Sequence, residues 1–195
     1  MPTGRRTIGI IGYGRIGSYV YEQITSRPEL GLEVIFVHDL DKERIADLPQ
    51  ELVLDRAEDF MSRNPDMVCE LAHPNVSRAY GTMFLEKTDY FLLSVTALAD
   101  AELEAALNET AVKSGTRLYI PHGGVMGLDA IVEGQDSWEE IRFVMKKNPK
   151  NLDFTWSGID PSTITGVTTL YDGPTRGICP KFPRNVNTHA TVALG

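Results

Sequence analysis

Short continuous apolar runs alternate with helical patterns along the first 120 residues of the chain. The apolar runs lie at residues 7–11, 32–37, 52–54, 67–71, 90–95 and 118–120. Between them, apolar side chains recur every three or four positions, for example at Ile16, Val20 and Ile24, and at Val76, Tyr80 and Met83. Strands buried on both faces of a sheet read as continuous apolar runs, and parallel strands need crossover helices. The alternation therefore predicts a repeated βαβ unit with a parallel sheet.

Individual residues predict where two of the helices begin or end. Pro28 is expected to end the first helix, because a proline cannot continue one. Asp100 is expected to cap a helix that runs to Ser114. Gly115 is expected to close that helix in a left-handed conformation.

The pattern changes after Pro121. Residues 138–147 alternate the apolar side chains of Ile141, Phe143 and Met145 with polar ones, as a half-exposed antiparallel strand does. Residues 148–162 are rich in Asn, Pro, Asp, Ser and Gly and are expected to form a loop, followed by a threonine-rich strand at 163–171. We therefore predict one domain at residues 1–121 and a second, smaller domain at residues 122–195.

A glycine-rich turn joins the first predicted strand to the first predicted helix. Gly12, Gly14 and Gly17 follow the G-x-G-x-x-G pattern of dinucleotide-binding Rossmann domains. The first glycine permits the turn, the second lets a pyrophosphate approach the backbone, and the third lets the helix pack on the strand. Arg15 and Ile16, in the same turn, are also predicted cofactor contacts. The alternative is a tight turn without a ligand.

The second predicted strand ends at Asp39, roughly 20 residues after the glycine-rich turn. An acid at this position can accept a hydrogen bond from the 2′-hydroxyl of the adenosine ribose, and it repels a 2′-phosphate. Leu40, not an arginine, follows it, so NAD is favoured over NADP. The alternative is that Asp39 only caps the following turn, a role for which Asp41 is better placed.

Ligands of doubly wound sheets bind at the carboxyl ends of the strands. These ends are predicted at residues 72–74, 94–96 and 121–124. Ala72, His73 and Ser94 are therefore predicted to contact the cofactor, and Thr96 and His122 are predicted to lie on the nicotinamide side near the substrate. By position, His73 and His122 can each touch either cofactor or substrate. His38, inside the second predicted strand, is interpreted as a buried histidine whose hydrogen bonds are satisfied.

Composition narrows the class of protein. The chain has 195 residues, of which 42% are hydrophobic and 24% charged, which is typical of a globular protein. Its 19 basic and 27 acidic residues give a net charge of −8, which argues against a nucleic-acid partner. Neither a membrane-spanning run nor an N-terminal secretion signal is evident, so the cytoplasm is expected. Cys69 and Cys179 match no metal-ligand or redox spacing and are interpreted as free thiols.

Four segments, in this order, resemble the L-aspartate dehydrogenase family, most closely its animal-type members. They are the turn GYGRIG (12–17), SVTALAD (94–100), IPHGGVMGLDAI (120–131) and LYDGPTRGICPKFPRNVNTHATVALG (170–195). The resemblance implies NAD(P)-dependent interconversion of L-aspartate with iminoaspartate, which hydrolyses to oxaloacetate and ammonia. It also implies a Rossmann domain followed by a smaller α/β domain, with a mixed or antiparallel sheet, that carries the contacts to a dicarboxylic substrate and to the second subunit of a homodimer.

The resemblance also implies roles for individual residues. Gly124 matches a cofactor-contacting turn, and Asn187 matches an asparagine near the nicotinamide, with Asn185 as its rival. Capping of the last helix is the alternative role of Asn187. For a substrate carboxylate, the family pattern favours Lys147. The other candidates are Lys146, Arg184 and Ser94, and a solvated surface lysine is the alternative for Lys147.

The chain departs from the family pattern at three points. The family's catalytic histidine lies downstream of Gly195, so we assign no catalytic residue, expect a C-terminally truncated chain and keep His189 as an alternative base. His122 stands where a serine is common, and Thr96 where a glycine is frequent, so a different amino or oxo acid is a second hypothesis. A non-catalytic NAD(P)-binding protein is the third. Apolar surface is expected on the last predicted helix.

Overall fold

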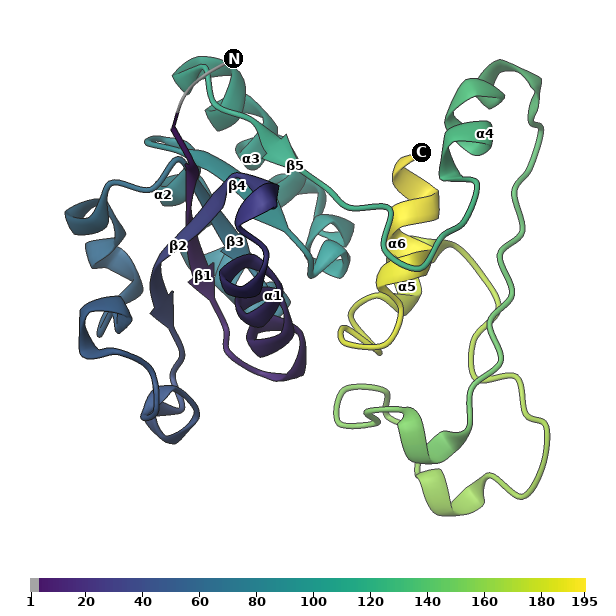
Figure 1. Cartoon of the computed structure of the whole chain (residues 1–195). Helices are drawn as coiled ribbons and strands as arrows, with labels where there is room; N and C mark the ends of the chain where they lie inside the picture. The colour runs from purple at the N-terminus through teal and green to yellow at the C-terminus, as the bar shows by residue number, and fades with distance from the viewer. Residues whose placement is uncertain (1–3) are drawn as a thin grey trace.

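The computed structural model describes residues 4–195 and contains one five-stranded parallel sheet within them (Figure 1). Residues 1–3, part of the segment inspected for a secretion signal, lie outside the described residues. The strands are β1 (Arg6–Ile11), β2 (Leu32–His38), β3 (Met67–Glu70), β4 (Asp89–Leu92) and β5 (Leu118–Tyr119). Their order is β2-β1-β3-β4-β5, with every neighbouring pair parallel. The predicted parallel α/β fold is therefore confirmed.

Helices cover both faces of this sheet. Helix α1 (Arg15–Ser26) lies on one face, and α2 (Pro74–Leu85) and α3 (Ala101–Ser114) lie on the other (Figure 1). Because side chains alternate along a strand, β1 sends Ile8 and Ile10 into one hydrophobic cluster and Ile11 into another. Burial on both faces explains the continuous apolar runs in the sequence.

The predicted helix ends are confirmed. Helix α1 ends at Ser26, and Pro28 opens a short 3-10 helix. The side chain of Asp100 accepts hydrogen bonds from the backbone N–H groups of Glu102 and Leu103 at the start of α3. Gly115 closes α3 with a left-handed φ of 68°.

Three α-helices follow the sheet: α4 (Leu128–Glu133), α5 (Thr175–Ile178) and α6 (Asn187–Leu194). The 3-10 helices are Pro28–Leu30, Lys42–Ile45, Gln50–Leu52, Ala57–Arg63, Val95–Ala99, Gln135–Ser137, Pro149–Asn151 and Pro161–Thr163. In the part of the chain that the structure describes, no helix has the length and apolar character needed to cross a membrane.

Two strand predictions in the first region need correction. The strand predicted at 52–54 is wrong, because Gln50–Leu52 forms a 3-10 helix and Val53 makes only an isolated bridge with Val37. The strand predicted at 90–95 ends at Leu92. It stops there because the backbone N–H of Ser94 donates to the carboxylate of Glu70 and not to a neighbouring strand.

The predicted strands at 138–147 and 163–171 are wrong, and with them the second, antiparallel or mixed sheet. Among the described residues 122–195 the backbone forms no strand. The two segments run beside each other (Figure 1), joined by an ion pair between Arg142 and Asp172, but without a ladder of backbone hydrogen bonds. An alternating pattern specifies a strand only where a partner strand lies in register beside it.

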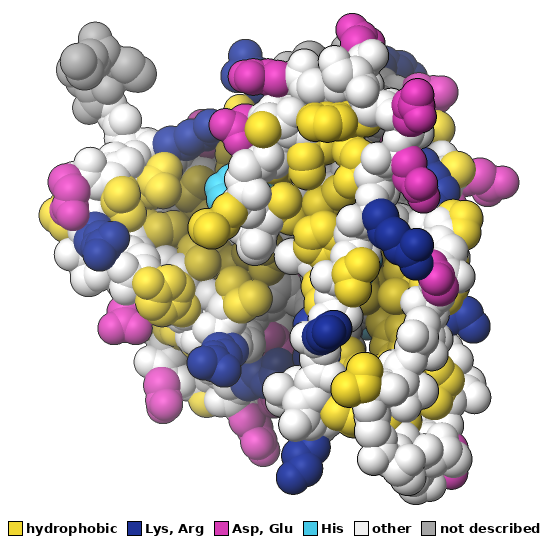
Figure 2. Space-filling view, turned by 90° about the vertical axis from the view of Figure 1, so that its right-hand side faces the viewer, with side chains coloured by type: hydrophobic (Ala, Val, Ile, Leu, Met, Phe, Trp, Pro, Cys, Tyr) yellow, Lys and Arg dark blue, Asp and Glu magenta, His cyan; other side chains and the backbone are white. Residues whose placement is uncertain are grey.

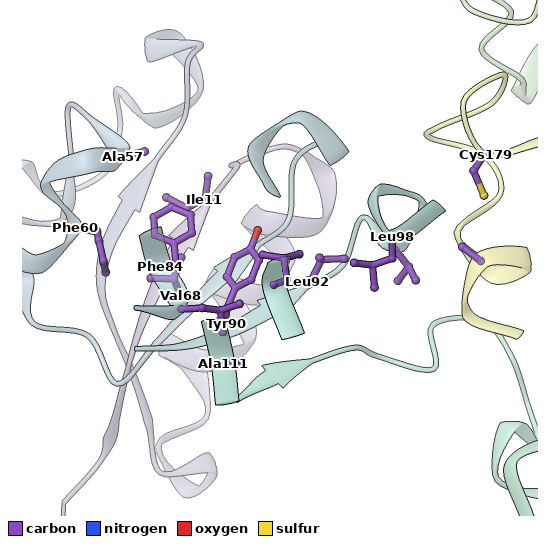
Figure 3. Close-up of a cluster of buried hydrophobic side chains, with 14 of the residues drawn as sticks. Ile11, Ala57, Phe60, Val68, Phe84, Tyr90, Leu92, Leu98, Ala111 and Cys179 are labelled. Carbon is purple, nitrogen blue, oxygen red and sulfur yellow. The ribbon is translucent and has the colours of Figure 1, made fainter. Parts of the chain in front are cut away.

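The last helix is less exposed than the sequence suggests. Helix α6 packs against the 3-10 helix Val95–Ala99, and Ala190, Thr191 and Val192 are buried there. Figure 3 shows the larger hydrophobic cluster continuing from Phe84 beside the sheet, through Leu98, to Cys179. The prediction of apolar surface on this helix is therefore wrong.

Both cysteines are free, as predicted, and the structure shows that both are buried. Burial raises the pKa of the Cys69 thiol to about 12 and that of the Cys179 thiol to about 11. Such thiols stay protonated and unreactive at neutral pH.

Candidate functional site

The glycine-rich turn after β1 is closely packed at two positions and open at the third. A Cβ on Gly17 would lie 2.0 Å from the carbonyl oxygen of Gly12, and a Cβ on Gly12 would lie 2.6 Å from the Cβ of Ala72. Gly12 also has a φ of 100°, which favours glycine. At Gly14, by contrast, the nearest described atom is an Arg44 nitrogen 3.8 Å away. Gly14 therefore has room for a Cβ, whereas close packing at Gly12 and Gly17 leaves none.

The N-terminus of α1 is suited to an anion. Gly14 occupies the N-cap and supplies no side-chain cap, and the first turn of the described helix contains no acidic residue. The first backbone N–H groups of a helix have no partner within it, and the helix dipole makes this end positive. Arg15 and Ile16, both exposed, form this first turn. A phosphate can bind here without displacing a side chain.

Asp39 links the end of β2 to the glycine-rich turn. Its Oδ2 accepts a hydrogen bond from the N–H of Tyr13 at 2.6 Å, and its Oδ1 accepts one from the N–H of Asp41 at 2.8 Å. Only 8% of the residue is exposed. A carboxylate has about four lone-pair positions, so it can still accept ribose hydroxyls. Asp41 in turn caps the helix Lys42–Ile45, as predicted.

Glu70, at the end of β3, is a residue that the sequence reasoning missed. It is fully buried, and its carboxylate accepts hydrogen bonds from Ala72 N (2.7 Å), Ser94 Oγ (2.9 Å) and Ser94 N (2.8 Å). Burial raises the pKa of Glu70, and these hydrogen bonds oppose that rise. Glu70 thus joins the carboxyl ends of β3 and β4 beside the glycine-rich turn. The signal was an acid inside an otherwise apolar run.

The turn after β4 binds the segment before α6. The N–H of Thr96 donates to Oδ1 of Asn187 at 3.1 Å, and the Thr96 hydroxyl donates to the carbonyl oxygen of Pro183 at 2.6 Å. Val186, not Asn187, occupies the N-cap of α6. The capping alternative for Asn187 is therefore wrong, and its side chain is brought to the same edge of the sheet as Ser94.

Asn185 and Lys147 lie next to this contact. The Lys147 ammonium donates to the carbonyl oxygen of Asn185 at 2.7 Å. The Asn185 side chain points the other way, since its Oδ1 accepts from Asp153 N at 2.8 Å and its Nδ2 donates to Asn151 O at 3.1 Å. Of the two rival asparagines, the structure brings Asn187 to the strand ends and directs Asn185 into the 148–153 loop.

The four histidines have different surroundings. Nδ1 of His38 lies 2.9 Å from the carbonyl oxygen of Leu54, which confirms a buried and satisfied side chain. His73 caps α2 by accepting from Asn75 N at 3.2 Å. Burial lowers the pKa of His73, and the charges of Arg184 and Arg78 lower it further, while the charge of Asp153 opposes this. His122 is exposed in the loop after β5.

His189 and Gly124 complete this side of the site. The ring of His189 packs edge-on against Phe143 at 4.8 Å between centroids, and its Nδ1 has no hydrogen-bond partner among the described residues. Burial lowers the pKa of His189, and the charge of Lys147 adds to this effect. A Cβ on Gly124 would lie 3.4 Å from Cγ2 of Thr188, so the loop after β5 lies against α6.

A dinucleotide fits this edge of the sheet. Its pyrophosphate can lie against the N-terminus of α1 over Gly14, and Asp39 can accept a hydrogen bond from its adenosine ribose. The site lies where the strand order reverses on either side of β1, the usual ligand position in such folds. The fold and the glycine-rich turn are those of an NAD-binding Rossmann domain.

Two family comparisons are more specific. Residues 12–121 match the family described as homoserine dehydrogenase, NAD binding domain, and residues 129–195 match the family described as aspartate dehydrogenase, C-terminal. The chain belongs to the L-aspartate dehydrogenase family, and it is an NAD(P)-dependent amino-acid dehydrogenase. The family resemblance found in the sequence is thereby confirmed.

Individual proteins and one crystal structure are similar to this chain and carry aspartate dehydrogenase names. The aspartate dehydrogenase domain-containing protein of Xenopus tropicalis is 33% identical over 97% of this chain and 69% of its own length. The L-aspartate dehydrogenase of Archaeoglobus fulgidus is 28% identical over 96% of this chain and 71% of its own. The crystal structure of aspartate dehydrogenase from Thermotoga maritima superposes with a TM-score of 0.68 at 27% identity, over 97% of this chain and 73% of that one.

Proposed function

We propose that this protein interconverts L-aspartate with iminoaspartate, and so with oxaloacetate and ammonia, using NAD. The observation that carries the proposal is the contact between Thr96 and Asn187, which brings the 183–187 segment to the strand ends beside the glycine-rich turn. The same segment holds Lys147 through the carbonyl oxygen of Asn185. One cation and one amide are thus brought to the edge of the sheet where the reactive end of NAD is expected.

Each group has a chemical role in this proposal. Bound NAD supplies the hydride acceptor for oxidation at the Cα of the amino acid. Asn187 uses its Oδ1 for Thr96 N, so its Nδ2 is left as a donor that can orient a carboxamide or a substrate carboxylate. The Lys147 ammonium has three donors and gives one to Asn185 O, so two can bind a carboxylate. Glu70 keeps Ser94 in place.

Several predicted contacts belong to the proposal. They are the cofactor contacts Gly12, Gly14, Arg15, Ile16, Gly17, Asp39, Ala72, His73, Ser94, Gly124 and Asn187, and the substrate contacts Thr96, His122 and Lys147. The Thr96 hydroxyl donates to Pro183 O, so it can only accept a hydrogen bond from a substrate. A homodimer, also predicted from the resemblance, is part of the same proposal.

Kinetics of the purified protein test the substrate. Oxidation of NADH is followed with oxaloacetate and ammonium, and with matched oxo acids such as 2-oxoglutarate and pyruvate. We expect oxaloacetate to give the highest kcat/KM. A higher kcat/KM for another oxo acid would overturn the proposed substrate, and tight NADH binding without any turnover would favour a non-catalytic protein.

The Lys147→Met variant tests the substrate contact. We expect the KM for oxaloacetate to rise about tenfold with little change in kcat, because a charge-assisted hydrogen bond is worth about 1.5–3 kcal/mol. Lys150→Met is the matched control, since Lys150 is an exposed lysine in the following 3-10 helix Pro149–Asn151. An unchanged KM in Lys147→Met would show that Lys147 is a solvated surface lysine and does not contact the substrate.

A further inference from the structure

Arg184 is a cation on the segment before α6, which lies at the edge of the sheet where the substrate is proposed to bind. On one side of it, the carbonyl oxygen of Pro183 accepts a hydrogen bond from the Thr96 hydroxyl at 2.6 Å. On the other side, the carbonyl oxygen of Asn185 accepts one from Lys147 at 2.7 Å. Both chain neighbours of Arg184 are therefore fixed, which limits the space that its guanidinium can reach.

The charge of Arg184 acts on the carboxyl end of β3. His73 follows this strand and caps α2. Burial lowers the pKa of His73, and the charge of Arg184 is the next cause of that shift, ahead of the charge of Arg78. Charges shift a pKa mainly from nearby. A guanidinium of the second region thus lies close to a strand end of the sheet, beside a predicted contact of the cofactor.

The guanidinium of Arg184 is available to a ligand. Among the described residues, its ion-pair partner is Asp153, whose Oδ2 lies 4.0 Å from Nη1, and the Arg184 side chain is 65% exposed. An exposed pair at this distance contributes little free energy. Oδ1 of Asp153 is already used, since it accepts from the N–H and the hydroxyl of Thr155 at 3.1 and 2.6 Å. A ligand carboxylate can therefore replace Asp153 and accept two hydrogen bonds from the guanidinium.

Two cations on neighbouring chain positions suit a ligand with two carboxylates. The Lys147 ammonium bonds to Asn185, the residue after Arg184, and keeps two donors free. Arg184 presents its donors in a planar fork that matches a carboxylate. Ser94, a rival candidate from the sequence, donates its hydroxyl proton to Glu70 and has none left for a carboxylate. The net charge of the chain is −8, so this pair of cations is a local feature.

We propose that Arg184 determines the specificity of this site for a dicarboxylic amino acid: it binds the side-chain carboxylate of L-aspartate, while Lys147 binds the carboxylate that all amino acids share. The inference rests on the proposed function, the oxidation of L-aspartate. In the free protein Arg184 pairs with Asp153, and the bound substrate replaces that pair. An amino acid with an uncharged side chain leaves Arg184 on Asp153 and lacks the contact.

L-Aspartate and L-asparagine test this inference, because the side-chain carboxylate of one is a carboxamide of the same shape in the other. Their oxidation by NAD is measured with the wild type, Arg184→Gln, Arg184→Lys and the control Arg78→Gln. The charge of Arg78 also acts on His73, but its Nη1 donates to Oδ1 of Asn75 at 3.0 Å. The control thus removes one nearby charge without removing the proposed contact.

Binding repeats the comparison without turnover. The affinities of succinate and of its monoamide, succinamate, for the complex with NADH are measured by calorimetry with the same four proteins. Where the oxidation of L-asparagine is too slow to measure, these two affinities decide. The affinity for NADH itself is measured by fluorescence.

We expect Arg184→Gln to lower kcat/KM for L-aspartate, and the affinity for succinate, about tenfold or more, as the loss of a charge-assisted hydrogen bond implies. The values for L-asparagine and succinamate should change less than about twofold, because they lack the carboxylate that Arg184 binds. Arg184→Lys keeps the charge but not the fork and should retain part of the preference for L-aspartate. Arg78→Gln should behave like the wild type, and NADH should bind all four proteins alike.

Three results would overturn the inference. They are an unchanged preference for the dicarboxylate in Arg184→Gln, an equal loss for both members of each pair, and a loss of NADH affinity, which would place Arg184 on the cofactor. If the wild type oxidises L-aspartate, these results leave the proposed function standing. A wild type that neither oxidises L-aspartate nor binds succinate would overturn the proposed function as well. Thermal unfolding checks that each variant is folded, and Arg184→Lys keeps the test valid should Arg184→Gln unfold.

Discussion

The two regions of the molecule, residues 6–119 and residues 122–195, differ in how far their large hydrophobic side chains are buried. In residues 6–119, Ile10, Phe36 and Val68 are completely buried on the faces of the sheet. In residues 122–195, large apolar side chains are open to solvent, among them Met126 (97% exposed) and Val167 (99%). Figure 2 shows such side chains, in yellow, gathered along the face that includes the second region. The first region forms most of the hydrophobic core, and the second adds a few buried side chains to it, among them Cys179 and Phe182.

The difference in burial reflects the kind of contact that fixes each region. Parallel strands in the first region are joined by ladders of backbone hydrogen bonds. The second region is joined to the first by the packing of α6 on Val95–Ala99 and by a few polar side chains. Arg176 donates to the carbonyl oxygens of Leu98 and Ala99 and to Glu104, and Thr96 binds Asn187 and Pro183. The contacts of Thr96 also belong to the candidate site. The site therefore depends on the less regular region.

The largest effect of substitution is expected in the glycine-rich turn. Gly17→Ala should destabilise the protein by about 3 kcal/mol, because its Cβ would overlap the backbone oxygen of Gly12 and backbone cannot yield. Gly166→Ala, in the second region, has open space around it and should change the free energy of unfolding by less than about 0.5 kcal/mol. Urea unfolding measures both. Equal effects would contradict the contrast between the regions.

Gly14→Ala separates packing from binding within the same turn. Its Cβ meets only the Arg44 side chain, so stability should hold while NADH affinity falls.

An intermediate effect is expected at the contact between the regions. Arg176→Met should raise hydrogen exchange in α5 and α6, corresponding to about 1–2 kcal/mol of lost local stability, and leave the sheet protected. Arg142→Met is the matched control, since its ion pair with Asp172 is exposed on both sides and contributes little. Equal exchange in the two variants would show that Arg176 does not fix the second region.

The smallest effect is expected from the titration of His189, which makes the free energy of unfolding depend on pH. Burial lowers the pKa of His189 in the folded protein below its unfolded value, so between these values the unfolded state binds more protons. Stability should therefore fall as the pH drops below about 6.5. His189→Gln should flatten this dependence, measured as the urea midpoint at about pH 7 and about pH 5.5. His122→Gln, at an exposed loop position, is the control, and a slope unchanged in His189→Gln would contradict the prediction.

Several features follow from the sequence with little help from the rest of the chain. The parallel sheet, the glycine-rich turn and the ends of α1 and α3 were all predicted, because each depends on a local pattern or on the backbone preference of one residue. The domain boundary at residue 121, the homodimer and the cytoplasmic location stay predictions. So do the individual contacts with cofactor and substrate.

Other features were decided only by the tertiary structure. Glu70 binds Ser94, Thr96 binds Asn187, and Arg44 reaches Asp39. The alternating pattern at 138–147 predicted a strand that did not form, because the hydrogen bonds of a strand belong to a neighbouring segment. By itself, the sequence determined most of the buried strands and helices, because these follow from the period of the apolar pattern. It also determined where the phosphate-binding turn lies, because that turn requires glycine. The partners of each polar side chain depend on how distant segments pack, and only the folded chain decides them.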